Sequence, residues 1–226
     1  MSVLDEIIAG VKEDLADRKI PRSEIEAAAY GAAPVIDCLP IMRVQEMAVI
    51  AEVKRSSPSK GALATIADPA ALAEQYQEAG ASAISVLTER RRFSGSLADL
   101  DAVRKRVSLP ILRKDFIVDG FQIVEAKAIG ADVILLIAAC LTKEELKNYG
   151  KLAEDLGMEV LYEVHTQEDL DKIDLHNKII GINNRNLNTF KVDLENSVNL
   201  ANQIPDDCIK IAESGLSDPR ILMWKC

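Results

Sequence analysis

Short apolar runs alternate with amphipathic stretches along most of this chain, and this alternation constrains the fold more than any other feature. Seven runs have the length and composition of buried strands, rich in Val, Ile, Leu and Ala. They span residues 49–54, 83–88, 110–115, 133–137, 159–164, 179–183 and 209–213. A helical pattern follows each of the first six, over residues 68–79, 97–106, 119–129, 142–156, 166–173 and 193–203. Strands joined in this way by single helices predict a parallel sheet.

The chain ahead of the first strand has a different pattern. Residues 3–18 and 22–30 carry apolar side chains every three or four positions, which is typical of helices. We therefore expect residues 1–45 to form an N-terminal helical extension packed on the outside of the sheet, and residues 46–226 to form the α/β domain. A chain of 226 residues with 48% hydrophobic content can bury one sizeable core.

Polar side chains stand at the carboxyl end of almost every predicted strand. They are Glu52 and Lys54, Thr88, Lys114, Glu163, Asn183, Glu213 and Ser214. A barrel assembles its site from several strand ends at one face, whereas an open doubly wound sheet uses mainly its switch point. The turn over residues 56–61 also lacks the glycine pattern that a dinucleotide-binding sheet requires. The sequence therefore predicts a (β/α)8 TIM barrel.

The end of the sequence is short for such a barrel. Only 12 residues (226 − 214) follow Ser214, too few for an eighth strand and its helix. We expect a barrel truncated after its seventh strand, with seven of eight βα units. The first and seventh strands would then have open edges, which predicts a poorly stable and aggregation-prone chain with weak or no catalytic activity.

Composition excludes several classes of protein. The net charge of −9 disfavours a nucleic-acid surface, and we expect the short basic run Arg90-Arg91-Arg92 to be a solvated loop. No run of 18 apolar residues is present, so no membrane span is expected. The first 20 residues are rich in acidic side chains, unlike a signal peptide. Four cysteines without CxxC spacing indicate a reduced cytoplasmic protein. Two histidines, His165 and His176, are too few for a histidine-rich metal site, and we expect His165 to be a loop or cap residue.

Two opposite charges interrupt the first strand. Glu52 and Lys54 are two residues apart, so a strand directs both side chains to the same side. Charges that face inward are costly unless they pair or meet a ligand. Lys114 and Glu163 end two later strands in the same way. Four such charges at one end of a barrel predict general acid–base catalysis, and the alternative is a set of structural salt bridges at the rim.

Three further features suggest binding groups. Ser214 and Gly215 follow the last strand and precede a helix start, an arrangement that can hold a phosphate. Phe93 and Phe116 lie just past strand ends, where they would either stack on an aromatic substrate or cap the barrel core. Arg185 could clamp a carboxylate or order neighbouring acids, or lie in an ordinary polar turn.

Together these motifs resemble those of the indole-3-glycerol phosphate synthase family. The resemblance covers roughly residues 1–217, with the motifs in the family's order and at its spacing. It is carried by Ile50-Ala51-Glu52-Val53-Lys54-Arg55-Ser56-Ser57-Pro58-Ser59, Leu87-Thr88-Glu89, Phe93-Ser94-Gly95-Ser96, Arg113-Lys114-Asp115-Phe116-Ile117, Asp132-Val133-Ile134-Leu135-Leu136-Ile137, Glu163, Gly181-Ile182-Asn183-Asn184-Arg185-Asn186-Leu187 and Ala212-Glu213-Ser214-Gly215. The helical extension before the first strand is also similar to that of the family.

The resemblance implies a reaction and a set of roles. The family closes the indole ring of 1-(2-carboxyphenylamino)-1-deoxyribulose 5-phosphate in tryptophan biosynthesis, with loss of carbon dioxide and water and without a cofactor. It implies that Lys114 is the general acid at the substrate carbonyl and Glu163 the general base. Lys54 would contact the substrate, and either lysine would be the acid in the dehydration. Glu52 and Asn183 would support the intermediate. Positions that match substrate-binding residues are Ser57, Phe93, Phe116, Arg185, Leu187, Glu213, Ser214 and Gly215.

The expected partner is a phosphorylated small-molecule substrate, with no metal, nucleic acid or membrane. Association with another enzyme of tryptophan biosynthesis is a further expectation of the resemblance. Two alternatives stay open at this point. One is another phosphosugar barrel enzyme, although the Glu-x-Lys pair on the first strand disfavours it. The other is a truncated, non-catalytic remnant that binds a phosphorylated ligand or a partner.

Overall fold

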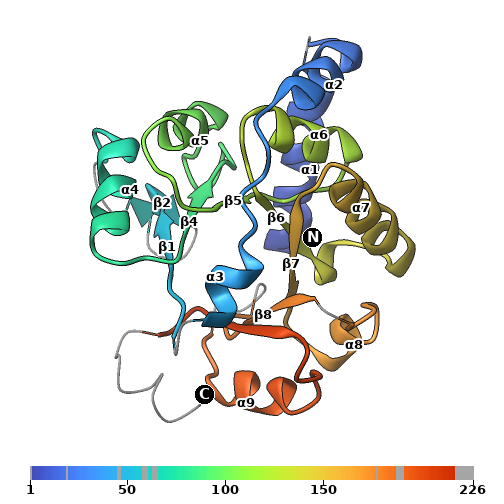
Figure 1. The fold of residues 1–226 in the computed structure, drawn as a ribbon. Helices are drawn as coiled ribbons and strands as arrows, with labels where there is room; N and C mark the ends of the chain where they lie inside the picture. The colour runs from blue at the N-terminus through green and yellow to red at the C-terminus, as the bar shows by residue number, and fades with distance from the viewer. Residues whose placement is uncertain are drawn as a thin grey trace.

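Seven parallel strands form a single sheet in the computed structural model, which describes all residues except 1, 19, 45–46, 58–60, 63–65, 177, 187–190 and 217–226. The strands are β1 (Ile50–Val53), β4 (Ala83–Leu87), β5 (Ile111–Lys114), β6 (Val133–Ile137), β7 (Glu159–Val164), β8 (Ile179–Asn183) and β9 (Ile209–Glu213). They pair in chain order, and every pair is parallel. Figure 1 shows them curving around a common centre. The predicted parallel barrel fold is confirmed, with seven strands among the described residues.

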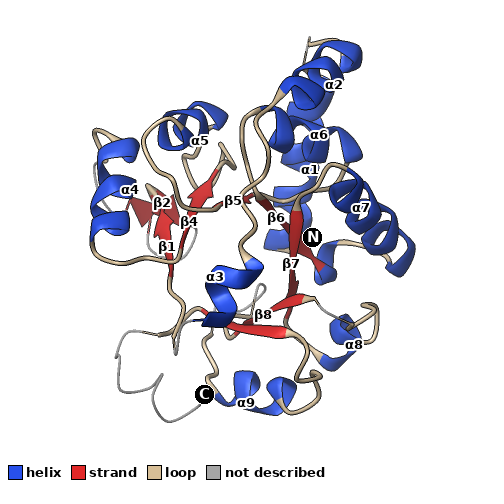
Figure 2. Ribbon diagram, in the orientation of Figure 1, coloured by secondary structure: helices blue, strands red, loops and turns tan. Residues whose placement is uncertain are grey.

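A helix connects each strand to the next, as predicted, and Figure 2 shows these helices outside the strands. They are α4 (Pro69–Glu78), α5 (Leu97–Arg104), α6 (Gly120–Ala128), α7 (Lys143–Asp155), α8 (Gln167–Leu170) and α9 (Glu195–Ala201). Local sequence sets their starts, as in the capping box of α7, where Thr142 and Glu145 exchange hydrogen bonds. The helix α8 is much shorter than the predicted 166–173.

The N-terminal extension forms three helices, α1 (Val3–Ala16), α2 (Arg22–Gly31) and α3 (Leu39–Val44). The sequence pattern did not predict α3, which lies across the middle of the ring of strands (Figure 1). Buried contacts fasten the extension to the barrel: Lys127 donates to the carbonyl of Ala33, and Asp132 accepts from the N–H of Ile36. The division into residues 1–45 and 46–226 stays a prediction.

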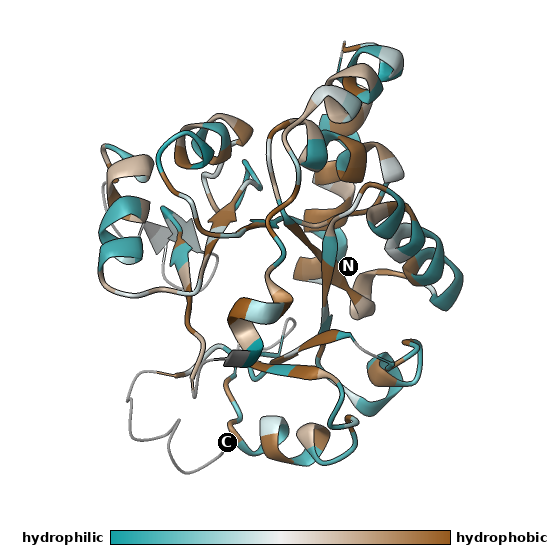
Figure 3. Cartoon of the chain, in the orientation of Figure 1, coloured by the Kyte–Doolittle hydropathy of each residue, from teal (hydrophilic) through white to brown (hydrophobic). Residues whose placement is uncertain are grey.

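Apolar side chains form two clusters, one on each face of the sheet. Along β6, Ile134 and Leu136 belong to the cluster beneath the helices, whereas Val133, Leu135 and Ile137 belong to the cluster inside the ring. This alternation follows from the two-residue period of a strand. Figure 3 shows the hydrophobic colour concentrated on the strands, with hydrophilic colour on the outer sides of helices such as α7. The central strands of the sheet are thus buried on both faces, as their nearly all-apolar sequences predicted.

The two ends of the sheet are less buried than its centre. All five residues of β6 are buried, whereas β9 alternates between exposed and half-buried residues. Among the described residues, β1 pairs only with β4 and β9 only with β8. Two short elements were not predicted: the hairpin of β2 (Ser56–Ser57) with β3 (Gly61–Ala62), and the 3-10 turn η1 (Ala138–Cys140).

Candidate active site at the carboxyl ends of the strands

Lys114 lies at the centre of a charged cluster where the strands end, a region called the mouth below. Its Nζ donates to Glu213 Oε2 at 2.9 Å and lies 3.2 Å from Glu52 Oε2. Since these carboxylates come from β9 and β1, one ammonium group joins the ends of three strands. Lys54 pairs with the other oxygen of Glu52. This pairing confirms that Glu52 and Lys54 point to the same side of β1.

The cluster holds Lys114 and Glu52 in their charged forms. Burial disfavours the ammonium group, but the carboxylates of Glu213, Glu52 and Glu163 outweigh it and raise the pKa of Lys114 above its ordinary value. Burial also opposes ionisation of Glu52, yet Lys114 and Lys54 lower the pKa of this carboxyl below its usual range. The mouth therefore presents a fixed cation beside a fixed anion.

Glu163, in β7, has the opposite electrostatic environment. Its side chain is 3% exposed. Burial and the neighbouring Glu213 raise the pKa of Glu163 to about 8, against the opposing effects of Lys114 and of a hydrogen bond from Asn183. That bond runs from Asn183 Nδ2 to Glu163 Oε1 at 3.1 Å. A carboxyl group in this state can take up and release a proton near neutral pH, as acid–base catalysis requires.

A glycine in β8 makes room for the cluster. Gly181 lies next to β9 in the sheet, and a Cβ at this position would approach Glu213 Oε1 to 2.3 Å. A side chain there would push the Glu213 carboxylate away from Lys114. Glu213 Oε1 is itself buried and has no hydrogen-bond partner among the described residues. The chain thus leaves space around a carboxylate whose hydrogen bonding is incomplete.

Two phenylalanines follow the ends of β4 and β5 and lie beside each other. The ring centroids of Phe93 and Phe116 are 6.2 Å apart, with their planes at 37°. The buried carboxylate of Glu89 orders the loop of Phe93 by accepting three backbone N–H groups, those of Arg91, Arg92 and Phe93. Both rings belong to the inner apolar cluster, which also includes Ile7 and Val11 of α1. Phe116 is buried and Phe93 is half-buried, and their stacking on a substrate stays a prediction.

The ends of β8 and β9 are tied together by an amide. Asn184 Nδ2 donates to the carbonyl of Glu213 at 3.1 Å and to that of Ser214 at 3.3 Å. Ser214 has φ +65° and Gly215 has φ +77°. A serine in the left-handed region is uncommon, and such residues gather at functional sites. The position predicted to hold a phosphate is therefore a strained turn held by Asn184.

For the remaining predicted binding residues, the contacts define a position in the site less clearly. Ser57 belongs to the β2–β3 hairpin, which reaches the loop after β4 because the Ser56 N–H donates to the carbonyl of Phe93 at 3.2 Å. Arg185 is half-buried, and its N–H donates to Asn183 Oδ1 at 3.0 Å. Leu187 lies outside the described residues. The roles of all three stay predictions.

Two features of the site were missed from the sequence. His165 was expected to be a loop or cap residue, and it does follow β7, but its Nε2 lies 3.3 Å from Glu163 Oε1. The two-residue spacing from Glu163 was the available signal. The basic run at residues 90–92 was expected to be a solvated loop. Instead, Arg91 forms ion pairs with Glu13 and Asp14, and Arg92 forms one with Glu6, so this loop is bound to α1.

The described residues contain neither a metal-binding group nor a membrane-spanning helix. No group of three or more His, Cys, Asp or Glu side chains there has an arrangement that could hold a metal ion. Likewise, no helix within the described ranges is long and apolar enough to cross a membrane.

Comparison with known proteins gives consistent matches. The family model described as indole-3-glycerol phosphate synthase matches residues 4–222. A protein of Kineococcus radiotolerans with that name is 52% identical, over 97% of this chain and 83% of its own length. Indole-3-glycerol phosphate synthase 1 of Streptomyces coelicolor is 50% identical, over 99% and 84%. Among solved structures, a tryptophan synthase complex from Pyrococcus furiosus matches with a TM-score of 0.55 and 16% identity, over 78% of this chain and 81% of that one. The last likeness concerns the fold alone.

Proposed function

The chain belongs to the indole-3-glycerol phosphate synthase family, and we propose that it closes the indole ring of 1-(2-carboxyphenylamino)-1-deoxyribulose 5-phosphate. The reaction forms one carbon–carbon bond and releases carbon dioxide and water. Membership of this family does not favour the two alternatives, another phosphosugar barrel enzyme and a non-catalytic remnant. A cytoplasmic location and association with another enzyme of tryptophan biosynthesis stay predictions.

The observation that carries the proposal is the position of Lys114. It lies between Glu213 and Glu52, with Glu163 close enough to affect its pKa. An ammonium group held in this way can give a proton to the substrate carbonyl oxygen as the ring carbon attacks, because the resulting alkoxide is a far stronger base than an amine. The surrounding carboxylates keep the lysine charged until that moment.

The remaining proton transfers of the reaction suggest roles for the other residues. Loss of carbon dioxide leaves its bonding electron pair with the ring. Loss of the new hydroxyl as water needs a second proton, for which Lys54 and the reprotonated Lys114 are the candidates. Completion of the indole removes one proton, and Glu163 is the group suited to accept it because its pKa lies near neutrality. Glu52 and Asn183 would hold the charged intermediate.

The proposed substrate contacts follow from the residues near the carboxyl ends of the strands. Phe93 and Phe116 offer an aromatic surface for the anthranilate ring of the substrate. The turn of Ser214 and Gly215 offers a hydroxyl and backbone N–H groups to the phosphate. Ser57, Arg185, Leu187 and Glu213 complete the proposed set.

The proposal is tested by assaying the purified 226-residue chain with the substrate and following the indole product by its fluorescence. We expect product formation by the unchanged chain and by Lys151→Met, a control at a lysine that is 66% exposed on α7. Lys114→Met should form product at a rate lower by about 10²–10⁴-fold. A folded, unchanged chain that forms no indole would contradict the proposal, as would a fully active Lys114→Met variant.

A further inference from the structure

The imidazole of His165 lies between two carboxylates, and neither of its nitrogens has a hydrogen-bond partner of good geometry among the described residues. Nε2 is 3.3 Å from Glu163 Oε1, and Nδ1 is 3.9 Å from Asp169 Oδ2. The side chain is 10% exposed. Buried polar groups rarely remain unsatisfied, so a ring this close to two acceptors is expected to bind one of them.

The position of His165 follows from the strand that precedes it. His165 comes two residues after Glu163, so the continuing chain directs both side chains to the same side. Its backbone is held at both polar groups. The N–H donates to Asp169 Oδ2 at 3.1 Å, and the carbonyl accepts from Asn196 Nδ2 at 3.2 Å. The ring is therefore kept beside Glu163 by α8 and α9, and a small rotation aligns its Nε2.

The side-chain amide of Asn183 shows which atom is the donor in the contact between His165 and Glu163. The N–H of Arg185 donates to Asn183 Oδ1, which leaves Asn183 Nδ2 to donate to Glu163 Oε1. Oε1 is thus the accepting oxygen of Glu163, and a proton on this carboxyl belongs on Oε2. Since His165 Nε2 also faces Oε1, it meets an acceptor and can bind it only as Nε2–H.

We propose that His165 is a positioning residue for Glu163, whose Oε1 it holds through Nε2–H while Oε2 takes the proton of the substrate. This inference deepens the proposed function and depends on it only for the role of Oε2. A neutral ring suffices, since burial lowers the pKa of His165. The charged or titratable groups that face the pair are Glu52 of β1, Lys114 of β5, Cys140 of η1, Asp169 of α8 with Lys172 after it, and Glu213 of β9.

Three substitutions separate this role from simple packing. In His165→Leu the donor is lost, so the ionised form of Glu163 loses support. We expect kcat/KM at pH 7 to fall by about tenfold to a hundredfold, and the acid limb of its pH profile to move up by about one pH unit. His165→Gln places an amide donor near the position of Nε2, so it should restore most of the lost kcat/KM and return the acid limb close to its original position. His165→Asn places its amide at the position of Nδ1 and should restore neither.

The control is His176→Leu, because His176 has a side chain that is 84% exposed. It should leave the pH profile unchanged. The proposal is overturned if a folded His165→Leu variant keeps the wild-type profile, or if His165→Asn restores it better than His165→Gln does.

A measurement without turnover distinguishes failure of this inference from failure of the proposed function. The chain has two histidines, so ¹⁵N-imidazole NMR of the full chain gives two sets of ring signals. We expect a neutral Nε2–H ring for His165 from pH 6 to 8, with signals that shift in Glu163→Gln, whereas that substitution should leave the signals of the distant His176 unchanged. An Nδ1–H or charged His165, or signals indifferent to Glu163→Gln, would overturn the inference whether or not the chain makes indole.

Discussion

Arg113 and Lys114 are consecutive residues of β5, yet they belong to two charged networks of opposite character. Because side chains alternate along a strand, Arg113 points outward to α6 and Lys114 points into the mouth. Both networks combine cations with several carboxylates in a largely buried setting. The comparison shows how a structural ion network differs from a reactive one.

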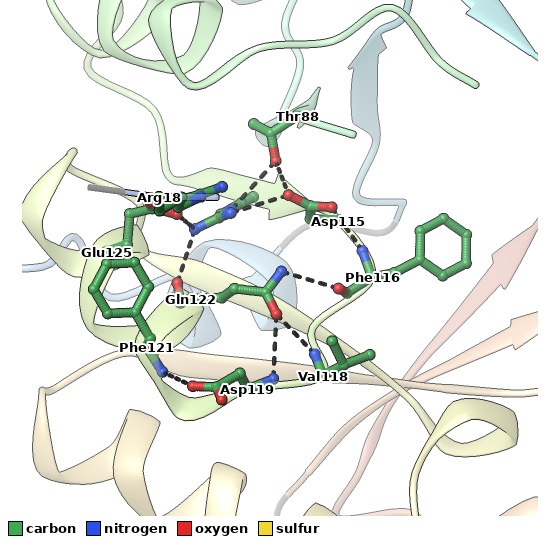
Figure 4. Close-up of polar contacts among 10 residues, drawn as sticks. Arg18, Thr88, Asp115, Phe116, Val118, Asp119, Phe121, Gln122 and Glu125 are labelled. Carbon is green, nitrogen blue, oxygen red and sulfur yellow. Dashed lines mark hydrogen bonds and ion pairs between the residues drawn. The ribbon is translucent and has the colours of Figure 1, made fainter. Parts of the chain in front are cut away.

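The Arg113 network is saturated in the sense that every guanidinium nitrogen has a hydrogen-bond partner. The guanidinium is 0% exposed and donates to Gln122 O, Glu125 Oε2, Asp115 Oδ2 and Thr88 Oγ1 at 2.8 to 3.2 Å. Figure 4 shows Thr88, Asp115, Gln122 and Glu125 gathered in one network, with Arg18 pairing with Glu125 from the N-terminal extension. The two carboxylates therefore stay paired, and each buried charge has several partners. Such a network can hold β5, α6 and the extension together.

The Lys114 network is incomplete by the same standard. Lys114 faces three carboxylates, Glu213 Oε1 has no partner among the described residues, and Glu163 has a raised pKa. Perturbed acids with unfilled hydrogen bonds gather at functional sites, because a substrate supplies the missing partner. The number of charges does not separate the two networks. What separates them is how many hydrogen-bonding positions remain free.

The sharpest way to break this comparison is to remove each cation in turn. Lys114→Met should lower kcat by about 10²–10⁴-fold. It should change the melting temperature by only a few degrees, because the carboxylates left behind can take up protons. Activity assays and thermal melts on the same preparation measure both effects. Loss of the cooperative melt together with the activity would show that Lys114 is needed for the stability of the fold.

Arg113→Met should show the reverse pattern. It leaves Asp115 and Glu125 buried with fewer partners, a change that costs about 3–5 kcal/mol of unfolding free energy. Urea unfolding measures this loss, and Arg106→Met is the control because Arg106 is 48% exposed and its ion pairs contribute about 1 kcal/mol or less. An Arg113→Met variant as stable as the control would mean that the saturated network is dispensable.

The space that Gly181 leaves beside Glu213 allows a further test of the comparison. In Gly181→Ala the new methyl group must displace the Glu213 carboxylate, which loosens its bond to Lys114. Loss of a charge-assisted hydrogen bond of this kind lowers kcat/KM by about tenfold to a hundredfold. Gly31→Ala at the end of α2 is the control, because nothing lies within 4 Å of the place that its new methyl group would occupy. Equal kinetics for both variants would show that Glu213 does not need its present position.

The Lys114 network should make both activity and stability depend on pH through Glu163. If Glu163 acts as an ionised base, kcat/KM should rise with pH up to about 8, the pKa of Glu163. Its effect on stability has the opposite sign. A carboxyl whose pKa is raised in the folded state stabilises the protein at low pH, and this contribution is lost as pH rises from about 4.5 to about 8. Glu163→Gln should abolish both trends, and a flat activity profile in the unchanged chain would contradict the assignment.

The smallest effect is expected at the exposed contacts between α1 and the loop after β4. Arg91→Ala removes ion pairs to Glu13 and Asp14, in which the Arg91 side chain is 43% exposed. Exposed pairs of this kind contribute about 1 kcal/mol or less and weaken with salt. Unfolding at low and high salt should therefore show a small difference from the unchanged chain that disappears at high salt. A salt-independent loss of several kcal/mol would indicate buried packing instead.

Sequence reasoning predicted the strands well, because nearly all-apolar runs and capped helices are local signals. It also placed Glu52, Lys54, Lys114 and Glu163 at one end of the barrel, since parallel strands all end at the same face. The family resemblance supplied the chemical roles, which no pattern of charges specifies. The short helix α3 was missed because six residues that include a proline carry little helical signal.

Contacts between distant segments were the part that sequence reasoning could not reach. The bond from Lys114 to Glu213 spans 99 positions in the chain, and nothing local specifies its partner. Arg91 and Arg92 looked like solvated charges because their acidic partners lie on α1, 77 to 86 positions away. His165 was assigned to a loop, and its contact with Glu163 depended on burial by α8 and α9.

The most direct test of catalysis by the Lys114 network follows the carboxyl carbon of the substrate. The substrate labelled with ¹³C at its carboxyl group is incubated with the unchanged chain, Lys114→Met and Arg113→Met, and labelled carbon dioxide and indole product are counted together. We expect one labelled carbon dioxide per indole from the unchanged chain and from folded Arg113→Met, and almost none from Lys114→Met. Equal release by Lys114→Met, or no release by the folded unchanged chain, would contradict the assignment of ring closure to this network.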